Sequence, residues 1–351
     1  MWFPDGRDYP GAGRPVVLLK GGPGAGPMDI ADANINLNAV LYRKKAAAGT
    51  AAGSSGGGLS AGAVAGIAVA AASAQSLLSQ LPTYGWQRCL VDYAAIQFVG
   101  DGDGQPVVLG EGASATVYQV LLNGVEPHAA KVFRLGSDPR AQLDFLEEAS
   151  LLRLLRHRSV VGFAGVCVAR GHGIILMELM EGGDLRSRNA EVDEWGLRRF
   201  GWYQRGKTVA LDIATAMHYL HSSSYTHFDI KSRNVLLSRD LTAKLADVGF
   251  TRAMRTTHHS VEGPIGTLDY MAPELLLNNS KCTNAVDTYS FGCLLHEICT
   301  GKYPSRGCLR DIHVPLEAPA EVAALVAACL QEDPARRPTA RQLVQALMDL
   351  Q

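Results

Sequence analysis

Three polar residues have the types and the spacing that phosphoryl transfer requires. Asp229 and Asn234 lie in the segment Tyr225–Leu237, and Asp247 follows 18 residues after Asp229. This reaction needs a carboxylate at the incoming hydroxyl and oxygen ligands for magnesium near the phosphates. An isolated His-x-Asp is usually a buried histidine beside a turn aspartate. Here two more polar residues, Lys231 and Asn234, follow Asp229 closely, and an Asp-x-Gly begins 18 residues after it. This combination favours the catalytic interpretation.

A glycine-rich segment could bind phosphate. A strand predicted at Pro106–Leu109 runs into Gly110–Tyr118, and a second strand is predicted at Gln119–Leu122. Glycine lacks a Cβ, so the backbone N–H groups of such a turn can approach phosphate oxygens closely. Taken alone this signal is weak, because many glycine-rich hairpins bind nothing and the third glycine position is occupied by Ala115.

A lysine and a glutamate follow in an order that strengthens this interpretation. Lys131 lies in a third predicted strand, His128–Phe133, and Glu148 lies 17 positions later in a predicted helix, Asp144–Leu152. A strand lysine held by a helix glutamate fixes the α- and β-phosphates of a nucleotide. Each residue alone would be read as a solvated surface charge. Their order after a glycine-rich hairpin favours an ion pair in a nucleotide site.

The composition indicates a globular protein. The chain has 351 residues, of which 47% are hydrophobic, enough to bury the core of a two-lobed domain. Its 33 basic and 34 acidic residues give no overall positive field, so nucleic acid is not an expected partner. The seven cysteines form no Cys-x-x-Cys pair and several lie in hydrophobic runs. We therefore expect reduced thiols, without disulfides or structural zinc.

The N-terminal region, residues 1–92, has a different composition. Ala46–Ala74 consists almost wholly of Ala, Gly and Ser, which predicts a disordered linker. The alternative is a membrane span at Leu59–Leu78, whose length is suitable but whose Ala, Gly, Ser and Gln content disfavours insertion. The first residues do not resemble a secretory signal, so the expected location is cytoplasmic. Anchoring through Leu59–Leu78 remains the alternative.

Residues 93–351 resemble a eukaryotic protein kinase domain, nearest the tyrosine-kinase-like group of serine/threonine kinases. The resemblance extends to Gly266–Glu274, to Asp287–Gly292, and to Arg337, which matches the arginine that pairs with Glu274. It implies an α+β, two-lobed fold. The N-lobe, about 93–180, would have a small antiparallel sheet and one main helix. The C-lobe, about 181–351, would be larger and mostly helical.

The resemblance also implies the ligands, ATP and Mg2+. Asp229 would be the catalytic base, assisted by Lys231 and Asn234, and the metal would bind Asn234 and Asp247. The residues implied to contact ATP are Leu109, Gly110, Glu111, Gly112, Ala113, Ser114, Ala115, Val117, Ala129, Lys131, Glu148, Met177, Glu178, Met180, Leu236 and Asp247. Among these, Met177 matches the gatekeeper and Glu178–Met180 the hinge that reads the adenine edge.

The pairing of Lys231 with Thr267 is typical of kinases that act on Ser and Thr, so the predicted partners are proteins with Ser or Thr hydroxyls. Three residues depart from the family pattern: Phe228 replaces the arginine before the catalytic aspartate, Val248 replaces the phenylalanine of Asp-Phe-Gly, and Ala115 replaces a glycine. Two other functions remain open, a pseudokinase scaffold and a receptor-like membrane kinase. The complete set of catalytic residues favours an enzyme.

Overall fold

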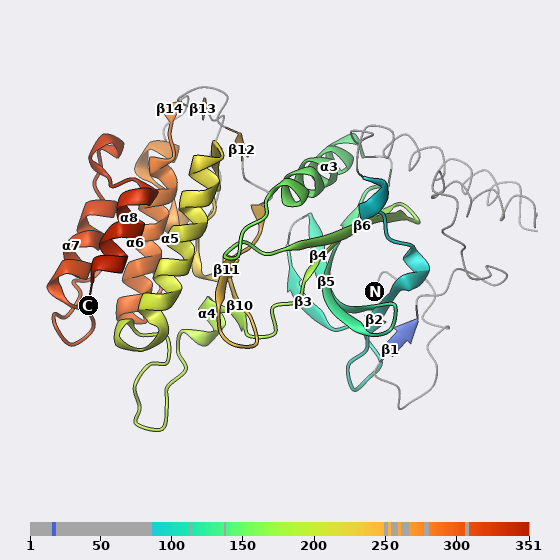
Figure 1. Cartoon of the computed structure of the whole chain (residues 1–351), viewed down its shortest axis with the longest axis horizontal. Coiled ribbons are helices and arrows are strands. Elements are labelled where there is room, and N and C mark those ends of the chain that lie inside the picture. The colour runs from blue at the N-terminus through green and yellow to red at the C-terminus, as the bar shows by residue number, and fades with distance from the viewer. Residues whose placement is uncertain are drawn as a thin grey trace, which may run out of the picture. The chain divides into compact units, whose positions relative to one another are not determined.

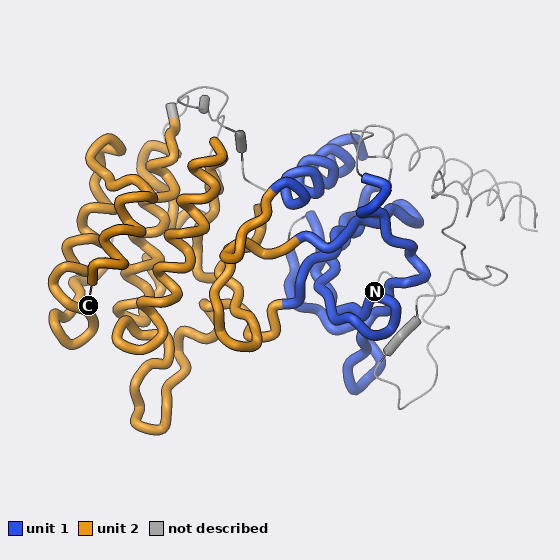
Figure 2. The backbone as a smooth tube through the Cα atoms, in the orientation of Figure 1, with its two compact units in different colours: residues 1–154, 163–179 blue, residues 155–162, 180–351 orange. Residues whose placement is uncertain are grey.

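The computed structural model describes residues 16–18, 86–112, 114–136, 138–248, 252–253, 259–260, 267–276, 281–305 and 309–350. The linker expected at 46–74 and the candidate span at 59–78 lie outside these residues. In the described part of the chain, no helix combines the length and apolar character needed to cross a membrane. The chain forms two compact units, residues 1–154 with 163–179 and residues 155–162 with 180–351 (Figure 2).

The first unit contains an antiparallel sheet and one long helix (Figure 1). The strand order is β1-β2-β4-β5-β7-β6, and β3 pairs with β4. The strands are β1 (Val16–Leu18), β2 (Ile96–Val99), β3 (Val108–Glu111), β4 (Ala115–Leu122), β5 (Glu126–Arg134), β6 (Phe163–Ala169) and β7 (His172–Glu178). The three strands predicted from the sequence overlap β3, β4 and β5. Strand β4 begins earlier than predicted because its pairing with β5 starts at Ala115.

Local sequence explains the tight connection between β6 and β7. Ala169 pairs with His172, so Arg170 and Gly171 form a two-residue turn, with φ of 54° and 78°. Two positive φ values are the signature of a turn whose twist matches that of the adjoining strands. Glycine adopts this conformation without a steric cost, which explains its presence at the second position.

Helix α3 (Pro139–Leu154) covers the helix predicted at 144–152 and extends it at both ends. Its buried side chains include Phe145 and Leu152. The Phe145 ring meets the edge of Phe133 on β5, with centroids 5.6 Å apart, and also lies against Gly173 on β7. A Cβ at position 173 would lie 2.5 Å from the Phe145 ring, so the sheet accepts the helix only because residue 173 is glycine.

The second unit is mostly helical. Its α-helices are α4 (Leu185–Arg188), α5 (Lys207–Ser222), α6 (Ala285–Thr300), α7 (Ala320–Cys329) and α8 (Ala340–Asp349). Its short strands are β8 (Gly183–Asp184), β9 (Tyr225–Thr226), β10 (Val235–Leu237), β11 (Ala243–Leu245), β12 (Arg252–Ala253), β13 (His259–Ser260) and β14 (Lys281–Cys282). They pair as β11-β10-β8, β12-β9 and β13-β14. This architecture and that of the first unit confirm the predicted α+β, two-lobed fold.

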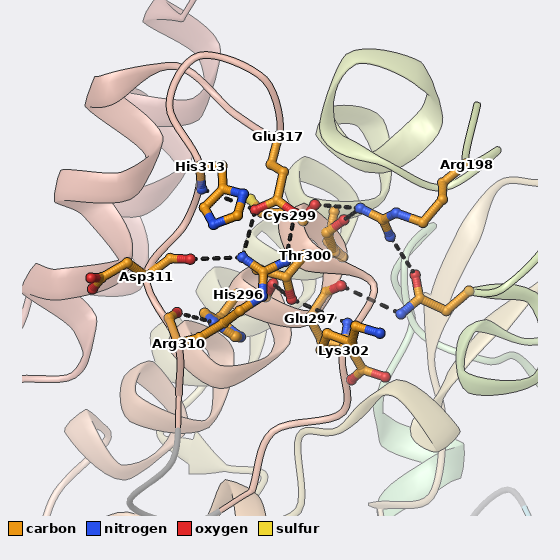
Figure 3. Close-up of polar contacts among 12 residues, drawn as sticks. Arg198, His296, Glu297, Cys299, Thr300, Lys302, Arg310, Asp311, His313 and Glu317 are labelled. Carbon is orange, nitrogen blue, oxygen red and sulfur yellow. Dashed lines mark hydrogen bonds and ion pairs between the residues drawn. The ribbon is translucent and has the colours of Figure 1, made fainter. Parts of the chain in front are cut away.

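Helix α6 is buried along nearly its whole length, which makes it the central element of the second unit. It ends at Gly301, with φ of 70°, as is usual for helices that end in a left-handed residue. The guanidinium of Arg198 donates to the last-turn carbonyls of Ile298, at 2.8 Å, and Cys299 (Figure 3). A cation at this end of a helix is also favoured by the helix dipole.

An ion pair also lies near this end of α6 (Figure 3). Arg310 binds both carboxylate oxygens of Glu317, at 2.9 and 2.5 Å, and its own carbonyl lies 2.8 Å from Nε2 of His296. The hydrogen bonds from Arg310 lower the pKa of Glu317 to about 2. These contacts hold residues 310–317, which lie between α6 and α7 in the chain, against α6.

The packed part of the first unit includes residues that precede the boundary expected at residue 93. Residues 86–92, which the sequence analysis placed in the N-terminal region, make contacts with the sheet, and Trp86 is buried. The backbone N–H of Val91 donates to Val166 O at 2.9 Å, and Leu90 forms a parallel bridge with Val166. This flanking segment is therefore part of the first unit.

The fit of Phe145 against Gly173 gives a testable prediction. Gly173→Ala should lower the free energy of unfolding by about 1–3 kcal/mol, because the added methyl overlaps a fully buried ring. Gly102→Ala is the matched control, since a Cβ there would meet nothing within 4 Å, and its effect should stay within about 0.5 kcal/mol. Urea denaturation measures both; equal effects of the two substitutions would contradict the packing argument.

Candidate active site

The glycine-rich hairpin connects β3 to β4. Gly112 donates from its N–H to Ala115 O at 2.9 Å, which closes the turn. A Cβ at Gly110 would meet no atom within 4 Å, and one at Gly112 would make only an ordinary contact, 3.4 Å from Ala115 O. The missing Cβ atoms thus leave space beside the backbone that a phosphate could use. Glu111 and Ser114 are exposed, and Ala113 lies outside the described residues.

Lys131 and Glu148 form the ion pair that the sequence predicted. Lys131 Nζ lies 2.7 Å from Glu148 Oε1, and only 13% and 6% of the two side chains are exposed. Lys131 lies on β5 between neighbours on β4 and β7, and Glu148 lies on the buried face of α3. Such a pair can hold a lysine toward nucleotide phosphates. Its geometry depends on the position of α3.

The residues predicted to line an adenine pocket are divided between the two units. In the first unit, Ala129 on β5 lies directly across from Met177 on β7, and Val117 lies on the neighbouring strand β4. Leu109 on β3 is 46% exposed, so it presents an apolar surface to solvent. Glu178 ends β7. The second unit carries the other two residues, Met180 and Leu236.

Around Asp229 the structure brings together three residues of the second unit, Lys231, Asn234 and Thr267. Lys231 Nζ lies 2.6 Å from Asp229 Oδ2, and Asn234 Nδ2 donates to the same oxygen at 3.0 Å. Thr267 donates to Asp229 Oδ1 from its N–H at 2.9 Å and from its hydroxyl at 2.8 Å. Lys231 also donates to Thr267 Oγ1 at 2.8 Å. These donors fix the orientation of a carboxylate that is only 3% exposed.

The backbone just before Asp229 is bound by Asp287 at the start of α6. Its carboxylate accepts from the N–H groups of His227 and Phe228, both at 2.8 Å, and from His221 Nε2 at 2.8 Å. Burial alone would raise the pKa of Asp287. The hydrogen bond and charge of His221, together with His227, instead hold this pKa below its ordinary value. Asp287 is thus a structural anion that supports residues 227–234, the candidate catalytic loop.

Asn234 and Asp247 were predicted to bind the metal. The Asn234 amide nitrogen donates to the backbone oxygen of Asp229 at 2.8 Å and to the Asp229 carboxylate at 3.0 Å. With the nitrogen used in this way, the amide oxygen of Asn234 can serve as the metal ligand. Asp247 has a left-handed φ of 59°. Within the described residues, no group of three or more His, Cys, Asp and Glu side chains could hold a metal. Two protein ligands suit magnesium, which is commonly completed by substrate phosphates and water.

Phe228, the most notable departure from the family pattern, lies in an apolar cluster. Its ring is 3% exposed and its φ is 69°. The other buried members of this cluster are Met271, Ala272, Leu275, Cys282 and Val286. Three of these lie four to eight residues after Thr267, and Cys282 belongs to β14. The ring therefore connects the loop that carries Asp229 to the segment that follows Thr267. Val248 is also buried, at 1% exposed.

The segment after Thr267 is further fixed by two polar contacts. Arg337 and Glu274 form the predicted pair, with Nη1–Oε1 at 2.7 Å and Nη2–Oε2 at 2.9 Å. Tyr270 donates to Glu297 Oε2 at 2.5 Å, and Ser232 donates to Glu297 Oε1 at 3.1 Å. Burial, followed by the charge of Glu297, raises the pKa of Tyr270. These contacts join the catalytic loop, the segment 267–276 and α6.

Sequence reasoning did not identify some residues that position the site. His221 and Glu297 lie on helices without a motif of their own, and the anchoring role of Asp287 was not recognised, although its motif was. The sequence offered one usable signal, the presence of Asp287 and Glu297 in the apolar run of α6. Charged side chains that are buried in such a run must be paired. Their partners named above could not be read from spacing, because they lie 27 to 66 residues away.

Residues 105–347 match the protein kinase domain family. Relatives include the receptor protein kinase WSS1 of Oryza sativa subsp. japonica, which is 31% identical over 238 residues, 67% of this chain and 26% of that protein. A probable serine/threonine-protein kinase of Dictyostelium discoideum is 32% identical over 271 residues, 73% of this chain and 28% of the relative.

A third relative, calcium/calmodulin-regulated receptor-like kinase 2 of Arabidopsis thaliana, is 34% identical over 215 residues, 60% of this chain and 48% of that protein. The matched region therefore covers less than half of each of these three relatives. Plant receptor-like kinases are among them, in agreement with the predicted tyrosine-kinase-like group. Together with the geometry around Asp229, the match over residues 105–347 confirms the resemblance seen in the sequence: this chain belongs to the protein kinase family.

Proposed function

We propose that this chain is a serine/threonine protein kinase that transfers the γ-phosphoryl group of ATP to hydroxyls of protein substrates. The observation that carries the proposal is the network in which Lys231, Asn234 and Thr267 all donate to Asp229. A scaffold has no chemical need for this arrangement. Lys231 and Thr267 also form the pairing typical of kinases for Ser and Thr.

In the proposed reaction the substrate hydroxyl gives its proton to Asp229 while its oxygen forms a bond to the γ-phosphorus. The bond from that phosphorus to the bridging oxygen breaks, and ADP leaves. Lys231 lies 2.6 Å from Asp229 Oδ2 and would neutralise charge on the transferring group. Magnesium, when bound by Asn234 and Asp247, would offset the charge of the phosphates. Lys131, held by Glu148, would orient the α- and β-phosphates.

The same proposal includes the nucleotide contacts and the partners predicted from the sequence. ATP would contact the glycine-rich hairpin, Lys131, the adenine-lining residues and Asp247. The partners would be proteins with Ser or Thr, without nucleic acid, since the chain has nearly balanced charge. We infer a cytoplasmic location from the composition. Recovery of the full chain only after detergent extraction would favour the alternative, anchoring through Leu59–Leu78.

Replacing the proposed base should separate chemistry from binding. Asp229→Asn should lower kcat by about 10²–10⁴-fold, because the amide cannot accept the substrate proton. ATP binding, followed as a nucleotide-dependent shift in Tm, should remain nearly unchanged. Asp240→Asn is the control, since Asp240 is an exposed turn residue bonded to Ser238 and Thr242. Equal kcat in the parent and in Asp229→Asn would refute the assignment.

Replacing the proposed metal ligand should instead weaken binding. Asp247→Asn should reduce the Tm shift produced by Mg-ATP, because the ligand stabilises the folded state in proportion to its affinity. Without magnesium, the small shift given by ATP alone should be the same in the mutant and the parent. A Mg-ATP shift that survives the substitution would exclude the metal role. Asp240→Asn again serves as the control.

Phe228 leads to a prediction about regulation. An arginine at this position ordinarily binds an activation-segment phosphate, whereas the buried Phe228 ring offers no charge to neutralise. Replacing Thr251, Thr256, Thr257 and Ser260 together by Ala should therefore change the initial rate by less than about fivefold, the size of a lost surface contact. The initial rate of phosphatase-treated parent protein should likewise stay within about fivefold of that of untreated parent protein. Loss of activity in both samples would show that phosphorylation is obligatory.

A further inference from the structure

A tryptophan that precedes the family-matched region is buried against the C-terminal end of α3. Trp86 is 4% exposed, and its ring meets the edge of Phe163, the first residue of β6, with centroids 6.3 Å apart and planes at 88°. The guanidinium carbon of Arg153 lies 4.7 Å from the centroid of the indole ring. Arg153 is in the last turn of α3, so one aromatic ring contacts both the sheet and this helix.

The segment that follows Trp86 is held firmly to β6. Val91 donates to Val166 O at 2.9 Å, and Leu90 forms a parallel bridge with Val166. A Cβ at Gly165 would lie 2.5 Å from Val91 Cγ2 and 3.1 Å from Cys89 O, so this close approach requires glycine at position 165. The flanking segment therefore has a defined site on the sheet, and Trp86 lies at its start.

These contacts give α3 a further attachment to the sheet. In the first half of the helix, Phe145 packs against Phe133 and Gly173. At its C-terminal end, Arg153 contacts Trp86. Glu148 lies between these two attachments, three residues after Phe145 and five before Arg153. The side chain of Leu152, one residue before Arg153, is also buried. The Arg153–Trp86 contact adds to this packing in the last turn of α3, where a shift of about 1 Å is enough to disturb a contact on which catalysis depends.

We propose that Trp86 is a positioning residue that holds the C-terminal end of α3 so that Glu148 stays within hydrogen-bond distance of Lys131. The inference rests on the proposed kinase function, since that function gives the Lys131–Glu148 pair its role. It gives a functional role to residues 86–92, which precede the family-matched residues 105–347. A residue that acts in this way supports the geometry of the site without contacting substrate.

A double-mutant cycle separates positioning from general stabilisation. Trp86→Ala should lower kcat/KM on the order of tenfold in the parent background. In the Glu148→Gln background the ion pair is already lost, so the same substitution should have little further effect. Trp86→Phe keeps a ring against Phe163 and Arg153 and should restore most of the activity. An equal loss of kcat/KM in both backgrounds, or no loss in the parent background, would overturn the proposal.

The matched control is Tyr93→Ala, which removes an aromatic ring from the residue that follows the flanking segment. The ring centroid of Tyr93 lies 5.2 Å from the guanidinium carbon of Arg170. Arg170 belongs to the turn between β6 and β7, so this contact does not involve α3. Tyr93→Ala should lower the free energy of unfolding but leave kcat/KM near that of the parent at a temperature where both proteins are folded. If it lowers kcat/KM as much as Trp86→Ala does, the effect is one of stability and the proposal fails.

A second measurement does not require activity. Amide hydrogen exchange over α3 should be faster in Trp86→Ala than in Tyr93→Ala, while exchange in β5 should be alike in the two variants. Trp86→Leu, which also removes the aromatic ring, provides the same comparison if the alanine variant does not fold. Equal exchange over α3 in the Trp86 and Tyr93 variants would overturn positioning. An inactive parent protein with faster α3 exchange in the Trp86 variant would instead refute the kinase function and retain the positioning.

Discussion

The catalytic loop depends on one buried carboxylate, that of Asp287. A buried anion is costly unless hydrogen-bond donors surround it. Asp287 obtains them from the N–H groups of His227 and Phe228 and from His221, each at 2.8 Å. Because two donors are consecutive backbone groups, satisfying the anion fixes the chain direction immediately before Asp229. The orientation of Asp229, and with it the whole donor network, follows from this contact between a loop and the most buried helix of the second unit.

Ion pairs elsewhere in the chain work in the same way. Lys131 and Glu148 are 17 residues apart, Arg337 and Glu274 are 63, and both pairs are largely buried. Pairs of this kind contribute little net stability, because desolvation offsets the attraction between the charges. Removing one partner is nevertheless costly, since it leaves an uncompensated buried charge. Their principal effect is therefore to fix the relative position of two segments within one unit.

Sequence spacing predicted the elements whose function depends on local order. It identified the hairpin, the strand of Lys131, the helix of Glu148 and the loop from Asp229 to Asn234, because these motifs are continuous or follow at fixed intervals. It did not predict the packing of Trp86 on α3. The residues before Trp86 carry no charge as far back as Ala46, which resembles a linker, and the ring contacts Phe163 and Arg153, far along the chain. Tertiary contacts of this kind leave no periodic pattern.

Phe228 shows how these constraints combine. A bulky residue at φ of 69° is strained by about 1–3 kcal/mol. The hydrogen bond from its N–H to the charged Asp287 contributes about 1.5–3 kcal/mol, and burial of its ring contributes a similar amount. Either contribution is comparable to the strain, so the two together hold the backbone in place without a cation at residue 228. Apolar packing is also less sensitive to salt than an ion pair is. The end of the segment that follows Thr267 is thus attached to the catalytic loop by a contact that needs no phosphate.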